Sequence, residues 1–314
     1  MNEDDFKYGF TNAHQALMGY SALNSYCDNT NYEPFESNSS TEVMEPVEVM
    51  QEYLDKIVQL CNENNIDLIL VKTPSTAANI KKYNYLNQYA TEHNIQYIDF
   101  NEKAVYSEMG YNFATDNHDG GHLNIWGARK VSNYIGDVLV NQYNINTGES
   151  AQHEQLLEYY AEIKKGCELR TVTDFYEYLD WINDPQYVVF ISIKDEGTAA
   201  LDDELKEKLA ALGATVDFND AYRYSYYAVI NGDADDEEIK DDELSSNGTI
   251  RNGVVMYEIS SAGYENGNKS SIIIDGTEYS KNLRGMNIVV YSLITHKVID
   301  AVCFDTCEGL VATR

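Results

Sequence analysis

The residues best suited to chemistry in this sequence are an aspartate and a histidine separated by two glycines, Asp119 and His122. Gly120 and Gly121 disfavour a regular helix through the motif but allow the backbone to bend sharply. The apolar residues of 123–140 recur at a spacing of three and four, which predicts a helix directly after the motif. The pair is therefore expected on a tight loop at a helix start. An Asp–His pair in that place can orient and activate a serine hydroxyl.

The residues of this loop allow two other interpretations. In the first, the aspartate caps the helix and the histidine is an ordinary surface residue. In the second, the loop binds a metal, because Asp116, His118, Asp119 and His122 are all ligand types and the two histidines have i,i+4 spacing. The two glycines break the helix that this spacing requires. No metal site and no cofactor are predicted.

Helices and strands alternate around the motif, as in a doubly wound α/β sheet. The pattern predicts a helix over 46–64, a buried strand over 67–71, a helix over 77–93 and a strand over 96–100. Such sheets place their sites at the carboxyl ends of the strands. Two strands are too few to cover both faces. The 46–145 segment is therefore interpreted as a truncated domain, preceded by an irregular polar segment over 1–45.

The block Asp-x-x-His-Leu-Asn-x-x-Gly-Ala follows a Lys-Thr-Pro-Ser strand end and a Tyr-Ile-Asp-Phe strand. Together these resemble the last third of SGNH (GDSL-like) hydrolases, closest to the bacterial subgroup of DltD and the alginate O-acetyltransferases, over residues 46–142. The resemblance implies that Asp119 orients His122, and that His122 is the general base of a Ser-His-Asp triad. The family's Gly-Asp-Ser nucleophile block and Gly-x-Asn-Asp oxyanion block are not found here. We therefore expect an inactive site as given, with a missing N-terminal segment or a protein partner.

The second half begins with two helices, interpreted as a connector over 146–183, and continues with a compact α+β domain over 184–314. Its pattern predicts a helix over 201–212 that ends at Gly213. An acidic run over 233–243 is predicted to be a solvated loop. Strands are predicted over 187–193, 215–218, 224–231, 254–260, 271–275, 286–292 and 297–304.

Several separate blocks of this half resemble the interleukin-like EMT inducer (ILEI) domain over residues 185–307. They are Phe-Ile-Ser-Ile-Lys-Asp-Glu-Gly from residue 190, Asp-Gly-x-Glu-Tyr-Ser-x3-Arg-Gly-x-Asn from residue 275, and Cys-Phe-Asp-Thr from residue 303. The strand–helix block comes first here and last in animal members, as in a circular permutation. The resemblance implies carbohydrate binding, with Tyr264, Arg284 and Asn287 as candidate contacts. Turn and strand-end roles are the alternative for Arg284 and Asn287. Five tyrosines are candidates for exposed rings that could stack on sugars: Tyr222, Tyr224, Tyr226, Tyr227 and Tyr264.

Composition limits the possible partners. The net charge of −30 repels phosphate backbones, so nucleic acid is excluded as a partner, and neutral or cationic glycans fit better. No apolar run reaches the length of about 18 residues that a membrane span needs, and the polar start is not a signal peptide. By resemblance, the chain is expected to be a bacterial extracellular or cell-surface protein. Its function is either an esterase or O-acyltransferase on polysaccharide, or non-catalytic binding of carbohydrate or protein.

Overall fold

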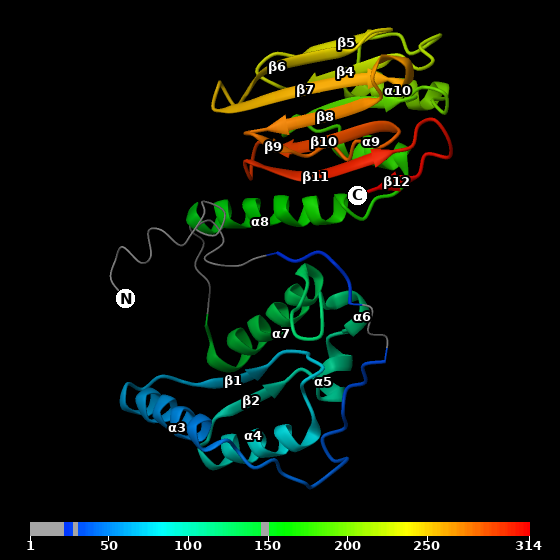
Figure 1. The fold of residues 1–314 in the computed structure, drawn as a ribbon. Helices are drawn as coiled ribbons and strands as arrows, with labels where there is room; N and C mark the ends of the chain where they lie inside the picture. The colour runs from blue at the N-terminus through cyan, green and yellow to red at the C-terminus, as the bar shows by residue number, and fades with distance from the viewer. Residues whose placement is uncertain (1–21, 28–30, 146–150) are drawn as a thin grey trace. The chain divides into compact units, whose positions relative to one another are not determined.

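The computed structural model describes residues 22–27, 31–145 and 151–314. The chain is a mixed α/β protein with two compact units, one of residues 21–149 and one that contains residues 150–314 (Figure 1). They are called the 21–149 unit and the 150–314 unit. Each is described by itself.

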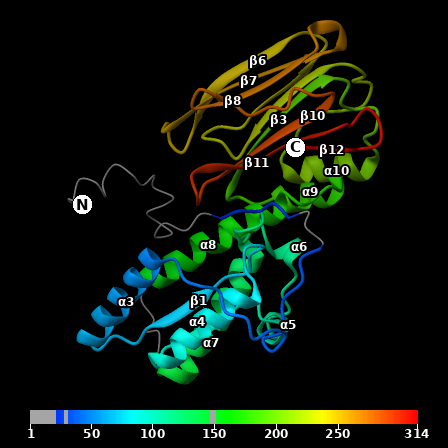
Figure 2. The same ribbon diagram turned by 60° about the horizontal axis from the view of Figure 1, so that its bottom comes forward.

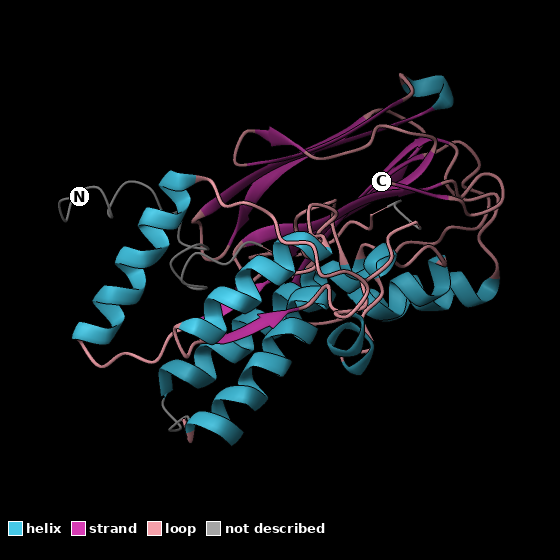
Figure 3. Cartoon of the chain, turned by 90° about the horizontal axis from the view of Figure 1, so that it is seen from below, coloured by secondary structure: helices cyan, strands magenta, loops and turns pink. Residues whose placement is uncertain are grey.

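The 21–149 unit contains the predicted alternation of helices and parallel strands. Helix α3 (Glu48–Glu63) precedes β1 (Ile69–Lys72), and α4 (Ile80–Glu92) connects it to β2 (Gln96–Asp99). The strands pair in parallel from Ile69 opposite Gln96 to Lys72 opposite Asp99. The long helix α7 (Ile125–Tyr143) follows, so this order of elements is confirmed. Figure 3 shows a strand of this pair between helices.

Two short helices between β2 and α7 were not predicted, α5 (Lys103–Glu108) and α6 (Phe113–Asp116). Each is too short to show a helical period, and each is fixed by the capping residue that precedes it. The Glu102 carboxylate accepts hydrogen bonds from the backbone of α5, and the Asn112 side chain accepts one from Ala114. These helices carry the chain from the sheet to the Asp–His loop.

The core of this unit is small. It consists of Ile98, Phe100, Tyr111, Val131 and Val138, with Phe100 edge-on to Tyr134. Helix α3 buries only Val58, whereas Met50, Tyr53 and Leu60 on another side are 68%, 62% and 59% exposed. Within the described residues, helix α3 therefore leaves apolar side chains exposed to solvent.

The 150–314 unit is organised around β3 (Tyr187–Asp195), which is buried for most of its length. One edge pairs antiparallel with β10 (Gly285–Ser292), which in turn pairs with β11 (Lys297–Phe304). The other edge is shared between β4 (Ser225–Ile230), antiparallel, and β7 (Val255–Gly263), parallel. Because two strands share this edge, the sheet curls over on itself (Figure 2).

The curled part of the sheet is completed by short or polar strands. Strands β6 (Leu244–Ile250) and β8 (Lys269–Ile274) flank β7, and β9 (Thr277–Glu278) follows at the edge. Strand β5 (Asp236–Lys240) pairs with β4, and β12 (Ala312–Thr313) pairs with β11. Inside the curl lies one apolar core, which includes Phe190, Val229, Tyr257, Ile272 and Val289.

Helices cover the other face of the sheet and form a second core. They are α8 (Ala151–Leu169), α9 (Phe175–Ile182) and α10 (Asp203–Leu212). The core includes Leu169, Phe175, Tyr178, Ile182, Leu205, Leu209 and Phe304. The two helices expected as a connector over 146–183 thus pack in the core of this unit. This compact unit includes the chain from residue 150, whereas the predicted domain begins at residue 184.

Two predictions of secondary structure in this unit are wrong. The acidic run is not simply a solvated loop, because residues 236–240 form β5. Its Glu237 carboxylate accepts hydrogen bonds from the Tyr226 hydroxyl at 2.7 Å and the Thr215 backbone amide at 2.8 Å. Residues 215–218 form no strand. Phe218 is buried there by edge-on packing against Tyr226 instead of by a β-ladder.

Candidate functional site

The Asp–His loop has the geometry of an oriented imidazole. Asp119 Oδ1 accepts hydrogen bonds from the backbone amides of Gly121 and His122, both at 2.8 Å, and Oδ2 lies 2.8 Å from His122 Nδ1. The Thr76 backbone amide donates to the Gly120 carbonyl at 2.9 Å and ties the loop to the end of β1. Asn124 then caps α7 by accepting from the amides of residues 126 and 127. The two backbone amides thus fix the Asp119 carboxylate, and the carboxylate orients the His122 ring.

The loop leaves the other ring nitrogen of His122 open. The side chain is 72% exposed, and Nε2 makes no hydrogen bond within the described part of the chain. The backbone amide of Gly121, followed by the imidazole of His122, lowers the pKa of Asp119 to about 2. Asp119 therefore stays ionised at any pH at which a histidine base works.

We expect the Asp119 carboxyl to titrate near pH 2 in a carbon-detected NMR titration of the full chain. Its pKa lies below the unfolded value of about 3.9. The charged carboxylate therefore stabilises the loop above that value, and the contribution is lost as the pH falls through about 2. In His122→Ala the pKa should rise but stay below the ordinary value, because the amide of Gly121 remains. Titration at the ordinary value in the native chain would show that the amides do not hold the carboxylate.

A serine that the sequence did not single out lies beside this loop. The Ser25 hydroxyl hydrogen-bonds His118 Nδ1, not His122. Its segment is anchored by the side-chain amide of Asn124, which donates to the Ser25 carbonyl at 3.2 Å. It is also anchored by Tyr26, whose ring stacks on Trp126 with 5.2 Å between the ring centres. No glycine flanks Ser25, so no local motif marks it, and only the tertiary contacts place it.

The same loop does not gather its four ligand-type residues around one point. Asp116 is buried, and its Oδ2 bonds Lys130 Nζ and the Asn112 backbone amide, each at 2.7 Å. His118 contacts Ser25, and His122 contacts Asp119. Among the described residues, no group of three or more His, Cys, Asp or Glu side chains is arranged to hold a metal ion.

In the 150–314 unit, two of the three predicted contact residues lie at one end of the sheet. Strands β3, β7 and β11 run in the same direction, and β10 runs against them, so the ends of the first three meet the start of β10. Tyr264 directly follows β7, and Arg284 directly precedes β10. The β3–α10 and β11–β12 loops lie at this end too, because the Ala200 amide donates to the Thr306 carbonyl.

Asn287 and Arg284 are both engaged by their own chain. Asn287 is fully buried, and its amide bonds the Leu283 backbone on both sides, accepting from N at 3.1 Å and donating to O at 2.8 Å. It therefore clamps the loop before β10 and is not exposed to a ligand. The Arg284 guanidinium makes a two-pronged contact with Asp305, at 2.6 Å and 3.1 Å. Both side chains therefore make the turn and strand-end contacts that are the alternative to ligand binding.

Tyr264 belongs to an exposed aromatic cluster. The Arg223 guanidinium carbon lies 4.1 Å from the centre of the Tyr264 ring and 5.2 Å from that of Tyr222. These rings are 47% and 60% exposed. The backbone of Arg223 is held by the buried Glu196 carboxylate, which accepts its amide hydrogen. Tyr226 and Tyr227, which were expected to be exposed, are buried in the sheet. The exposed aromatic cluster therefore contains fewer tyrosines than expected.

No protein-family model matches this chain, and no curated protein or solved structure is significantly similar to it. Among the described residues, no helix is both long and apolar enough to cross a membrane.

Proposed function

We propose that this chain is a bacterial extracellular or cell-surface protein that acts on or binds carbohydrate. In this proposal, the 21–149 unit is the carboxyl-terminal part of an SGNH-type ester hydrolase or O-acyltransferase fold. The 150–314 unit is an ILEI-like module that binds glycan. Asp119 and His122 have the roles of orienting acid and general base.

One observation supports the ester site above all others. The Asp119 carboxylate is fixed by two backbone amides and contacts His122 Nδ1, which leaves the imidazole oriented with Nε2 open to solvent. That is the arrangement by which a carboxylate–histidine pair accepts a proton from a hydroxyl or water. The two amides hold the carboxylate independently of the histidine, so the ring meets an acceptor that is already fixed.

The glycan part of the proposal is supported by the exposed cluster of Tyr222, Arg223 and Tyr264. Aromatic faces beside polar groups are suited to sugar rings, which present an apolar face and a rim of hydroxyls. The strongly acidic chain favours neutral or cationic glycans over polyanions.

A second candidate, non-catalytic binding of carbohydrate or protein, is favoured by the position of Ser25. Its hydroxyl contacts His118, and no hydroxyl within the described residues hydrogen-bonds His122. An oriented base without a nucleophile cannot form an acyl-enzyme. In this alternative the 21–149 unit serves as scaffold.

We expect the purified chain to release nitrophenol from an aryl acetate without a burst, because no hydroxyl contacts the open nitrogen of His122. Any slow turnover by water attack should be lost in His122→Ala and kept in His93→Ala, a histidine at the end of α4. A stoichiometric burst that His122→Ala abolishes would contradict this expectation. Ser25→Ala would then show whether Ser25 is the nucleophile.

A further inference from the structure

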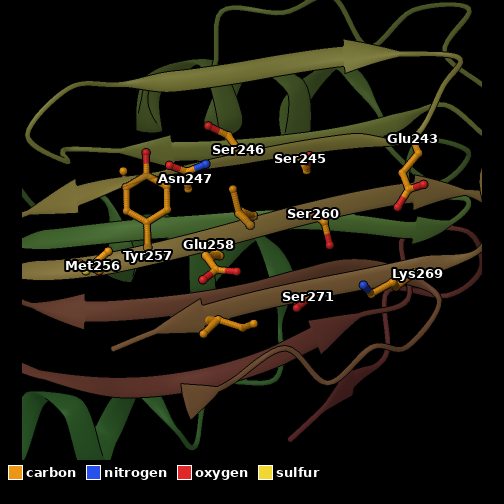
Figure 4. Close-up of a pocket in the computed structure, with 13 residues that line it drawn as sticks. Glu243, Ser245, Ser246, Asn247, Met256, Tyr257, Glu258, Ser260, Lys269 and Ser271 are labelled. Carbon is orange, nitrogen blue, oxygen red and sulfur yellow. The ribbon is translucent and has the colours of Figure 1, made fainter. Parts of the chain in front are cut away.

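The outer face of β6, β7 and β8 carries a row of three serines across the strands (Figure 4). The register places Ser245 opposite Ser260, and Ser260 opposite Ser271. Side chains on this face alternate with residues such as Tyr257 and Ile259, which belong to the apolar core. Neighbouring strands lie about 4.8 Å apart, so the row spans about 10 Å between its outer strands.

Longer side chains flank the row on both sides and turn it into a trough. On one side are Glu243, the residue before β6, and Lys269, the first residue of β8. On the other side the next row has Asn247 opposite Glu258, and Glu258 opposite Ile273. Because serines are short and their neighbours are long, the face is hollowed to a volume of about 460 Å³. This hollow is called the serine trough.

Most polar groups of the trough have no partner in their own chain. Ser271 donates to Glu278 at the sheet edge. By contrast, within the residues that the structure describes, the side chains of Glu243, Ser245, Asn247, Glu258, Ser260 and Lys269 make no hydrogen bond or ion pair. Glu243 and Lys269 line the same hollow without pairing. Two hydroxyls, an amide, two carboxylates and an ammonium group are thus available to a ligand.

We infer that the serine trough is a binding site for an oligosaccharide without acidic groups. The inference rests on the proposed glycan-binding function and assigns its site. Hydroxyls and amides donate and accept, carboxylates accept, and the ammonium donates, so together they match a ligand that presents many hydroxyls. Two carboxylates against one ammonium leave the trough net negative, which disfavours a uronic acid or phosphate polymer.

The shape of the trough favours a sugar chain over a peptide strand. A peptide binds a sheet by adding to a free strand edge, where backbone groups are exposed. The trough lies on a face instead, where the backbone groups of β7 are already paired with both neighbours. The turn at Tyr264–Asn266 follows β7 directly, and the Asn266 amide bonds Asp241 before β6 at 3.0 Å. The trough is thus bordered by the turn that carries Tyr264.

The test is calorimetric titration of the full chain with three tetrasaccharides: chitotetraose, its cationic de-N-acetylated form, and an oligogalacturonate. We expect binding of the first or second with a dissociation constant of about 1 mM, and none of the third. Ser260 is the middle serine of the row, so the larger side chain of Ser260→Tyr should fill the trough and weaken binding at least about tenfold. Glu258→Gln should weaken the cationic form most. Glu238→Gln, an exposed carboxylate on β5, is the control and should change nothing.

Each outcome supports or overturns the assignment. Binding that survives Ser260→Tyr but is lost in Tyr264→Ala would overturn the trough and leave glycan binding at the aromatic cluster. Preference for the oligogalacturonate would overturn the charge argument and with it the ligand class. If none of the three tetrasaccharides binds, the trough assignment is overturned, and the proposed glycan function loses its support as well. Far-ultraviolet circular dichroism of Ser260→Tyr separates lost binding from lost folding.

Discussion

Replacing Arg314 by alanine is expected to destabilise the 150–314 unit by about 3–5 kcal/mol, because it leaves a buried carboxylate unpaired. Asp300 is 4% exposed, and the Arg314 guanidinium binds it at 3.0 Å. The same guanidinium nitrogen donates to the carbonyls of Leu169 and Val172, at 3.0 Å and 2.9 Å. Without it, Asp300 keeps one side-chain partner, the hydroxyl of Tyr178 at 3.0 Å.

The double variant Arg314→Ala with Asp300→Asn separates the charge from the packing. It removes the unpaired carboxylate and should recover more than half of the lost stability. The chain has two tryptophans, Trp126 in the 21–149 unit and Trp181 in the 150–314 unit. In a Trp126→Phe background, urea unfolding followed by fluorescence therefore reports on the 150–314 unit alone. A loss below about 1 kcal/mol for Arg314→Ala would place the pair among surface ion pairs.

The parts of the fold that sequence could predict are those with an apolar period. Strand β11 is found at its predicted bounds, and α3, α4 and β2 lie within a few residues of theirs. Strand β6 was not predicted because only Leu244 and Ile250 at its ends are buried, and the residues between them are exposed or half-buried. The acidic strand β5 was not predicted because its pairing with β4, and the hydrogen bonds of Glu237 with Tyr226 and Thr215, are tertiary contacts.

The helices of residues 151–182 show why domain boundaries are harder to predict than elements. The sequence predicts a polar, acidic helix over 154–165 and a helix with an apolar side over 173–182, but it does not show which surface either helix covers. Tyr178 hydrogen-bonds Asp300, 122 residues further along the chain. A helix that covers a distant sheet and a helix that links two domains have the same local pattern. Only the packing distinguishes them.

The candidate site divides in the same way between local and distant contacts. Asp119 and His122 are three residues apart, so spacing and glycines were enough to predict their contact. Ser25 and His118 are 93 residues apart, and no motif connects them. Asn287 was proposed to bind a ligand, but its amide binds the Leu283 backbone. Sequence alone does not distinguish an amide that clamps a loop from one that contacts a ligand.

Gly127→Ala is expected to destabilise the 21–149 unit by about 3 kcal/mol, because helix α7 starts in direct contact with the backbone before the Asp–His loop. A methyl group on Gly127 would lie 2.0 Å from the Asp116 carbonyl oxygen and 2.7 Å from the Tyr111 hydroxyl. The Asp116 carbonyl cannot move alone, because it also accepts a hydrogen bond from the backbone amide of Asn124 at 3.1 Å. The helix start and the loop must therefore separate.

The matched control lies in the same helix. Gly136 of α7 has open space where a methyl group would be added, so Gly136→Ala should stabilise the unit by about 0.5–1 kcal/mol. Urea unfolding followed by Trp126 fluorescence in a Trp181→Phe background measures both variants. Gly127→Ala should also raise the pKa of Asp119, because the loop that fixes its carboxylate is displaced. An unchanged Asp119 titration beside a large loss of stability would mean that the loop keeps its geometry independently of the start of α7.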